Sequence, residues 1–298
     1  MNTRVTIREL AAWDFDMYPW RNQFVDAAML ERRAAVAARR LRRETPGDGP
    51  FGTEALLAEE TRFHKATLEE QRLRPALLAE MRGLDWSVGV VDLRRLIAFQ
   101  RRLVLDREAP AVHIPKQEDW PGLRSLAFES RRSLAHCVHS FARSANGCAI
   151  QLHSTNPDLR ISLAESVSDG TLPLILTGGS PFFEVAEFRD RWFLRDGYHR
   201  AYRMLRAGVT KGFAVIVHAR TLEEMGAVEP FFFGEEILFS ARPPVVVDFL
   251  EEDLVLTYER PRMRKTISVH IEESLEPVTD SVTSEYVGAE YVAQGGIE

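Results

Sequence analysis

Cysteine, lysine and long apolar runs are scarce in this chain of 298 residues, and each scarcity excludes a class of protein. Two cysteines in a chain of this length do not make a disulfide framework, which favours a reducing compartment. No apolar run reaches the roughly 20 residues that a membrane-spanning helix needs. The first ten residues, MNTRVTIREL, lack the apolar segment of a secretory signal. The composition therefore predicts a cytoplasmic protein with no membrane partner.

Lysine accounts for only four of the 38 basic residues, and the other 34 are arginines. Nucleic-acid surfaces usually draw on both residue types. The main arginine cluster, RRAAVAARRLRR at residues 32–43, has only Phe24 as a nearby aromatic residue, so bases have nothing to stack on within it. A solvated face of an alanine-rich helix explains this cluster more simply. Nucleic acid is therefore an alternative partner and not the favoured one.

The net charge of −6 is concentrated at one end of the chain. Residues 272–298 contain seven acids and no lysine or arginine, which leaves 37 acids (44 − 7) against 38 bases in residues 1–271. The body of the protein is thus nearly neutral. The tail, rich in Ser, Thr, Gly and Glu, is predicted to be disordered, and the alternative is a tail that shields a basic groove or binds a partner.

Several familiar catalytic signatures are also missing. The sequence has no Walker A motif, no G-x-G-x-x-G and no G-x-S-x-G nucleophile elbow. One group of metal-ligand residue types does occur, but its spacing matches no usual zinc pattern. Its members are His136, Cys137, His139, Cys148 and His153. We therefore expect no metal ion held by a protein cluster.

Hydrophobic spacing predicts that residues 1–150 form a mainly helical N-terminal region of unknown identity. Pro75 is expected to break or kink one of its helices, and Asn146-Gly147 is expected to form a turn that leads into a strand, CAIQLHST. The helical pattern covers residues 21–43, residues 53–82, the part of residues 86–106 after a short strand, and residues 123–143.

Residues 151–222 are predicted to form a compact mixed unit. It would contain a short helix at residues 161–170, the strand LPLILT, a hairpin of FFEVAEF and RWFLR, a helix that ends at Gly208, and the strand GFAVIVHA. Residues 223–271 would form a β-rich extension packed on this unit, with LVLTYE and KTISVHI as a hairpin. The predicted fold class is thus α+β, with a helical N-terminal portion, a small central unit and a β-rich C-terminal extension, followed by the tail at residues 272–298.

The strongest functional signal is the turn Asp196-Gly197-Tyr198-His199-Arg200, between an apolar strand and a helix. The first turn of a helix presents backbone N–H groups and the positive end of the helix dipole, which together attract phosphate. Arg200 can donate two parallel hydrogen bonds to a phosphate, and His199 can donate one from its ring. Asp196 can cap the helix or help a metal ion to hold phosphates. The alternative is a capped helix with two exposed polar residues.

The runs SLAESVSDGTLPLILT and RWFLRDGYHRAYRMLRAGVTKGFAVIV resemble the ParB/sulfiredoxin-like domain, over about residues 154–220. The resemblance implies that the turn binds the phosphates of ATP or CTP, here with Mg²⁺, through Gly197, Tyr198, His199 and Arg200. Phosphoryl transfer or hydrolysis of the nucleotide would follow, with Asp196 and Glu165 as candidate catalytic groups. A solvated helix residue is the favoured explanation of Glu165, and the catalytic role is the alternative.

Two departures from the family narrow this expectation. Sulfiredoxins have Gly-Cys-His-Arg at the turn, whereas this chain has Tyr198 in the place of the cysteine, so repair of sulfinic acid is not expected. ParB segregation proteins continue with DNA-binding helices, whereas this chain continues with PFFFGEEILFSARPPVVVDFL. The alternative function is a non-enzymatic interaction or nucleic-acid-associated protein that keeps the fold without catalysis.

Overall fold

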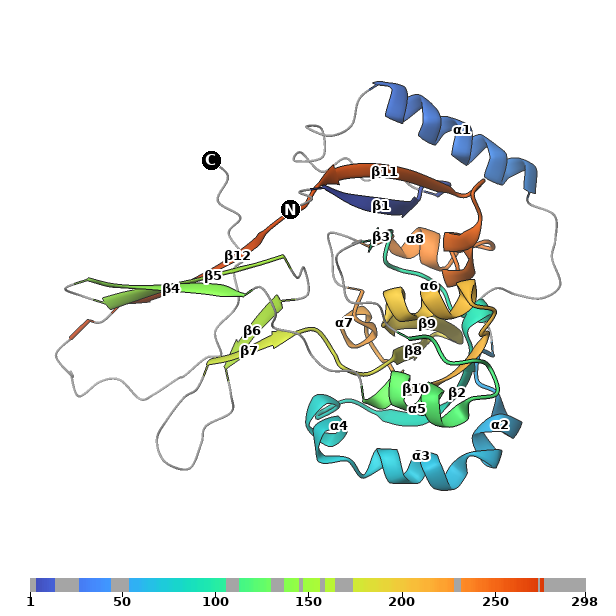
Figure 1. Ribbon diagram of the computed structural model, residues 1–298, viewed down its shortest axis with the longest axis horizontal. Helices are drawn as coiled ribbons and strands as arrows, with labels where there is room; N and C mark the ends of the chain where they lie inside the picture. The colour runs from blue at the N-terminus through green and yellow to red at the C-terminus, as the bar shows by residue number, and fades with distance from the viewer. Residues whose placement is uncertain are drawn as a thin grey trace, which may run out of the picture.

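The described part of the protein is mixed α and β, and strands occur from its first described residues onward (Figure 1). The computed structural model describes residues 4–13, 27–43, 54–105, 113–129, 137–144, 147–155, 159–163, 174–227, 232–272 and 274–275. The helices are α1 (Ala27–Arg43), α2 (Ala58–Phe63), α3 (Lys65–Arg72), α4 (Pro75–Glu80), α5 (Trp120–Phe128), α6 (Tyr198–Arg206), α7 (Leu222–Met225) and α8 (Glu235–Leu238), with 3₁₀ turns η2 (Leu93–Arg95) and η3 (Val246–Leu250). None of these helices is long and apolar enough to cross a membrane.

The strands form four sheets in the described part of the chain. A central sheet has the order β2-β10-β8-β9, and a second has the order β11-β1-β3. The third has the order β12-β5-β4, and β6 pairs with β7. Their bounds are β1 (Arg4–Leu10), β2 (Trp86–Asp92), β3 (Arg102–Leu105), β4 (Val138–Ser144), β5 (Gly147–Ser154), β6 (Leu159–Leu163), β7 (Leu174–Gly178), β8 (Glu184–Phe188), β9 (Arg191–Asp196), β10 (Lys211–His218), β11 (Val255–Pro261) and β12 (Lys265–Glu272).

The predicted helical N-terminal portion is wrong. Strands β1, β2 and β3 all lie before residue 106, and β4 occupies residues that were expected to be helical. Strand β3 occurs where a helix was predicted after β2. Its residues pair with β1, near the start of the chain, from Thr6↔Leu105 to Glu9↔Arg102. Helical spacing of apolar residues cannot exclude such a distant partner. Of the predicted helices, α1 is confirmed, and Pro75 begins α4 after α3 ends, which confirms the predicted break.

The central sheet and the sheet β11-β1-β3 form the main body of the protein. Each of them combines strands from the two halves of the sequence. Strand β2 pairs antiparallel with β10, and β1 pairs antiparallel with β11. The division into regions at residues 151 and 223 stays a prediction. The two pairings join the predicted N-terminal region to the predicted central unit and to the predicted C-terminal extension. The predicted hairpin of LVLTYE and KTISVHI is wrong, because β11 pairs with β1 and β12 pairs with β5.

The remaining strands extend to one side of the main body (Figure 1). The sheet β12-β5-β4 and the pair β6–β7 lie on the left of the view, while the central sheet and its helices lie on the right. Strand β6 begins at Leu159, so the predicted helix at residues 161–170 is wrong where it overlaps this strand. Residues 164–173, including Glu165, and most of the acidic tail are outside the described residues.

The core lies around the central sheet, where β10 is buried along most of its length. Fully buried aromatic side chains fill it, and edge-to-face pairs such as Trp120 with Phe213 add to the area that they bury. The largest are Phe99, Phe128, Phe182, Phe183, Phe193, Phe213 and Phe249.

A buried ion network holds the second sheet together. The carboxylate of Glu9, on β1, is 2 % exposed and forms ion pairs with Arg33 of α1 and with Arg102 of β3, the latter at 3.0 Å. Tyr258 of β11 donates its hydroxyl to the same carboxylate at 2.8 Å. Burial alone raises the pKa of Glu9, but Arg102 and Arg33 outweigh it and hold this pKa below its usual value. One side chain therefore joins three strands and a helix.

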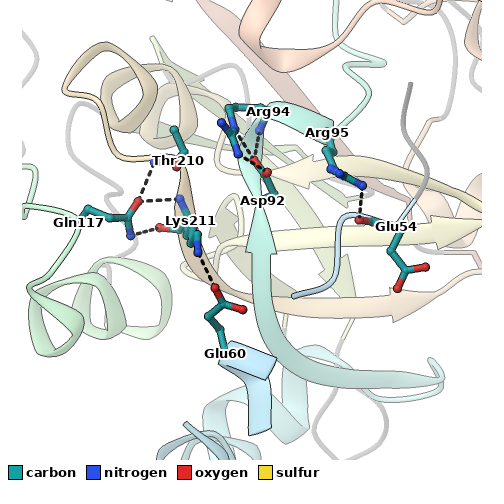
Figure 2. A network of polar contacts seen from close by, with 8 residues as sticks. All are labelled: Glu54, Glu60, Asp92, Arg94, Arg95, Gln117, Thr210 and Lys211. Atoms are coloured by element: carbon teal, nitrogen blue, oxygen red, sulfur yellow. Dashed lines mark hydrogen bonds and ion pairs between the residues drawn. The ribbon is translucent and has the colours of Figure 1, made fainter. Parts of the chain in front are cut away.

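Polar side chains also fix the start of β10 (Figure 2). The amide oxygen of Gln117 accepts hydrogen bonds from the backbone N–H groups of Thr210 and Lys211, at 2.8 Å and 2.9 Å. Its amide nitrogen donates to the carbonyl of Lys211 at 3.2 Å, and the ammonium of Lys211 pairs with Glu60 of α2. Gln117 thus supplies to β10 the hydrogen bonds that a further strand would supply.

Replacing Gln117 by alanine is expected to lower the free energy of unfolding by about 2 kcal/mol, because three backbone groups lose a partner at once. Urea denaturation of the wild type and the variant measures this difference. The neighbouring exposed residue Glu118 provides the control, and Glu118→Ala should change stability by less than about 0.5 kcal/mol. Equal losses for the two variants would contradict the role given to Gln117.

Candidate functional site

The predicted turn at residues 196–200 joins β9 to α6, as the sequence indicated. Gly197 makes the turn in the left-handed region with φ of 97°, which side chains with a Cβ rarely adopt. A Cβ at this position would also lie 2.7 Å from Cδ2 of Phe183. Both constraints require glycine where the strand ends and the helix begins.

The cap position of helix α6 is Gly197, which has no side chain to cap the first turn. Its first intrahelical hydrogen bond runs from the N–H of Ala201 to the carbonyl of Gly197, at 2.8 Å. The preceding N–H groups of Tyr198, His199 and Arg200 belong to the first turn, which carries the positive end of the helix dipole. This is the backbone arrangement that attracts an anion.

Arg200 forms hydrogen bonds with backbone carbonyls of neighbouring segments. Its guanidinium donates to the backbone carbonyls of Leu126 at 3.2 Å, Pro181 at 3.0 Å and Phe182, and its side chain is 13 % exposed. Burial lowers the pKa of Arg200, and the nearby Asp196 carboxylate, 4.0 Å away, partly offsets this effect. Arg200 therefore ties the start of α6 to the end of α5 and to the segment before β8.

Tyr198 points into the core. Its hydroxyl accepts hydrogen bonds from the backbone N–H groups of Phe99 and Gln100, at 3.0 Å and 3.2 Å. Burial raises the pKa of its phenol well above the usual value, so the group is neutral at any physiological pH. The side chain packs against Phe99 and Phe249.

His199 and Asp196 are the more accessible members of the turn. His199 is exposed, and its Nε2 lies 2.9 Å from the carbonyl oxygen of Val104, to which it donates. Asp196 accepts a hydrogen bond from the N–H of Ser180 at 3.3 Å, and its side chain is 36 % exposed. The structure thus brings residues 196–200 together in one turn, while Glu165 is outside the described residues.

A buried carboxylate that the sequence analysis did not single out lies beside this turn. Glu184, 1 % exposed, forms an ion pair with Arg195 and accepts a hydrogen bond from the hydroxyl of Ser180. Arg195 also donates to the carbonyl of Glu224 at 3.1 Å. The signal in the sequence was the position of this glutamate directly after two phenylalanines. An unpaired charge is costly among apolar residues, so a partner was to be expected. Glu184 and Asp196 balance Arg195 and Arg200, so the surroundings of the turn are close to neutral.

A second polar chain was also missed. The hydroxyl of Ser87 is 2.9 Å from Nε2 of His218, whose Nδ1 is 2.8 Å from a carboxylate oxygen of Glu187. The three residues line one cavity of about 380 Å³. The sequence carries no signal for this chain, because Ser87 and His218 are separated by 131 positions and no short motif contains both.

No protein metal site is present in the part of the chain that the structure describes. No group of three or more His, Cys, Asp or Glu side chains is placed to hold an ion there. Cys137 and Cys148 are free thiols. Cys148 faces Arg143 across the hairpin of β4 and β5, while Cys137 precedes β4.

Comparisons with known proteins identify no relative of this chain. No protein-family model matches the sequence, no curated protein is significantly similar to it, and no solved structure significantly matches its fold.

Proposed function

We propose that the turn at residues 196–200 binds the phosphates of a nucleotide, ATP or CTP, together with Mg²⁺. The observation that carries the proposal is the left-handed Gly197 turn into α6, in which the cap position is a glycine and has no side chain of its own. Backbone N–H groups at such a helix start can donate to phosphate oxygens. The resemblance of this segment to ParB/sulfiredoxin-like domains supports the same ligand.

Three side chains of the turn have different roles in the proposed site. His199 is exposed beside the first-turn N–H groups, and its ring would exchange its hydrogen bond to the carbonyl of Val104 for one to the phosphates. Asp196 supplies an oxygen for the Mg²⁺ that accompanies them. Arg200 already donates to three carbonyls, so its main role is to hold the turn in shape.

The bound nucleotide would then be used for phosphoryl transfer, for hydrolysis or as a conformational switch. Transfer or hydrolysis needs a group that orients the acceptor or the attacking water, for which Asp196 and Glu165 are the candidates. Binding without turnover would favour the alternative, a non-enzymatic interaction protein. Measuring phosphate release from each nucleotide separates these outcomes.

Calorimetric titration of ATP and CTP, with and without Mg²⁺, tests the proposal. His199→Ala is expected to weaken binding about tenfold, because one hydrogen bond to a charged group contributes roughly 1.5 kcal/mol. Arg206→Ala is the matched control, since it removes a positive charge from the opposite end of the same helix. It should change the affinity less than about twofold, because the effect of a distant charge is screened by salt.

Two results would contradict the proposal. The first is the absence of binding heat with either nucleotide under all four conditions. The second is an equal loss of affinity in His199→Ala and Arg206→Ala, which would indicate a general electrostatic attraction and not a site at the start of α6.

A further inference from the structure

Three neighbouring strands of the central sheet place Ser87, His218 and Glu187 on one face. Ser87 pairs with Ile216 across β2 and β10, so it shares a face with His218, two residues further along β10. His218 pairs with Glu187 across β10 and β8, and paired residues also share a face. The resulting chain runs from hydroxyl to imidazole at 2.9 Å and from imidazole to carboxylate at 2.8 Å.

This order of groups and these distances are those of an activated nucleophile. A hydroxyl becomes reactive when an adjacent imidazole accepts its proton, and a carboxylate on the other ring nitrogen fixes the tautomer that leaves Nε2 free to do so. The side chains of His218 and Glu187 are each 37 % exposed, so a small molecule can reach the chain from solvent. The cavity that the three residues line has a volume of about 380 Å³, within the range of small-molecule sites.

We propose that Ser87, His218 and Glu187 cleave small carboxylic esters, by an activity separate from nucleotide binding. The Ser87 oxygen attacks the ester carbonyl carbon while His218 Nε2 takes its proton. The tetrahedral intermediate then expels the alcohol, whose oxygen takes that proton from His218, and an acyl group stays on Ser87. Water attacks this acyl group with His218 as base, which releases the carboxylic acid and restores the serine. Glu187 is a positioning residue throughout.

Donors for the oxyanion lie on the outer edge of β2. The N–H of Val90 donates to the hydroxyl of Thr61 at 3.0 Å, and its carbonyl accepts from Leu57 at 2.8 Å, so the polar groups of Val90 point away from β10. Residues two apart in a strand point their backbone groups the same way, so the N–H of Val88 points to this edge as well. The N–H that follows a nucleophile commonly donates to the oxyanion. The Thr61 hydroxyl, which accepts from Val90, keeps its own proton for a second hydrogen bond.

The lining of the cavity indicates the class of ester. Apolar surface comes from Leu56, Val88, Trp192 and Ile216, and negative charge comes from the two carboxylates, Glu54 and Glu187. Apolar walls favour a short alkyl or aryl group, and the carboxylates disfavour an anionic substrate. Gly89 keeps this region closely packed, because a Cβ there would lie 2.8 Å from Leu56 and 2.9 Å from Ile216. The predicted substrate is therefore a small neutral or cationic ester.

Labelling with a fluorophosphonate in the absence of nucleotide, followed by peptide mass analysis, tests the proposal. The wild type should carry one adduct, on the peptide that contains Ser87, and should hydrolyse p-nitrophenyl acetate. Ser87→Ala should lose both. His218→Gln should slow labelling at least about 100-fold, because general-base assistance contributes factors of this size or larger. Glu187→Gln should lower kcat with KM nearly unchanged, since Glu187 does not contact the substrate's apolar part. Ser125→Ala, at a half-buried serine of α5 that donates to Glu129 and lies outside the cavity, should behave as wild type.

A second variant keeps the test decisive if Ser87→Ala folds poorly. Ser87→Cys changes the side chain little, and His218 should draw the proton from the introduced thiol. Iodoacetamide should then alkylate this thiol at least about tenfold faster than Cys137 and Cys148, which serve as internal references. An adduct at a different serine, or alkylation of the introduced thiol no faster than of the native cysteines, would overturn the proposal. Neither outcome would bear on the nucleotide site, because no residue of the cavity belongs to the turn at residues 196–200.

Discussion

Replacing Glu9 by alanine should lower the free energy of unfolding by about 3–5 kcal/mol, the usual cost of breaking a buried ion pair. Its removal leaves the guanidinium of Arg33 buried without this counter-charge and weakens the environment of Arg102 in the same way. The hydroxyl of Tyr258 also loses its acceptor. Chemical denaturation of the two proteins at neutral pH measures the difference.

The same sheet offers a matched control at its exposed end. Arg4 and Glu259 form an ion pair at 3.6 Å with both side chains more than half exposed. Glu259→Ala should cost less than about 1 kcal/mol, because solvent screens such a pair. A similar loss in both variants would contradict the central role of Glu9.

The Glu9 effect should also depend on pH in a defined direction. The folded-state pKa of Glu9 is lowered, so its stabilising contribution is complete above the unfolded-state pKa of about 4.3 and is lost as the pH falls through the folded-state value. The stability difference between the wild type and Glu9→Ala should therefore narrow below about pH 4. A difference that stays constant into this acid range would exclude an ionised Glu9 as its source.

Replacing Arg200 by alanine should lower the free energy of unfolding by about 3–4 kcal/mol. The substitution removes three hydrogen bonds from a charged donor and leaves the carbonyls of Leu126, Pro181 and Phe182 without it. Arg200→Lys should recover only part of the loss, because an ammonium cannot reproduce the planar fork of a guanidinium. Denaturation curves for both variants test this order.

His199→Ala is the control, one residue earlier in the same helix. Its side chain is exposed and its hydrogen bond to the carbonyl of Val104 is open to water, so the loss should be below about 1 kcal/mol. A nearly unchanged stability of Arg200→Ala would contradict the bracing role and return Arg200 to the position of a direct phosphate ligand.

The segment from β8 to β10 was predictable because its signals are local. The apolar segments of FFEVAEF and RWFLR flank Arg189 and Asp190, which both adopt positive φ in the hairpin turn. Gly197 and Gly208 mark the two ends of α6, and the spacing of its buried residues is that of a helix. The hairpin of β8 and β9 and the helix α6 form with partners a few residues away, whereas β10 also pairs with the distant strand β2.

Pairing between distant strands was not predictable. The hairpin of β4 and β5 is local, but the far edge of β5 is paired with β12, which comes from the end of the described chain. LVLTYE and KTISVHI were adjacent in sequence and chosen as partners, yet each has a different partner. Alternation of residues identifies a strand and says nothing of the strand beside it.

In the candidate site, too, local features were predictable and contacts between distant residues were not. The sequence identified the turn and its glycine, because both depend on backbone geometry within five residues. It could not show that Arg200 faces the carbonyls of Pro181 and Phe182, or that Tyr198 is directed at the backbone of Phe99. The chain of Ser87, His218 and Glu187 depends entirely on the order of strands in the central sheet.

Amide hydrogen exchange with and without nucleotide tests the central claim most directly. A phosphate bound at the start of α6 accepts hydrogen bonds from the first-turn N–H groups, so saturating ATP or CTP with Mg²⁺ should slow exchange in the peptide that covers residues 196–201. Peptides from the opposite end of α6 should change much less. Unchanged exchange at residues 196–201 in the presence of a nucleotide that binds would contradict the claim and place the ligand elsewhere on the protein.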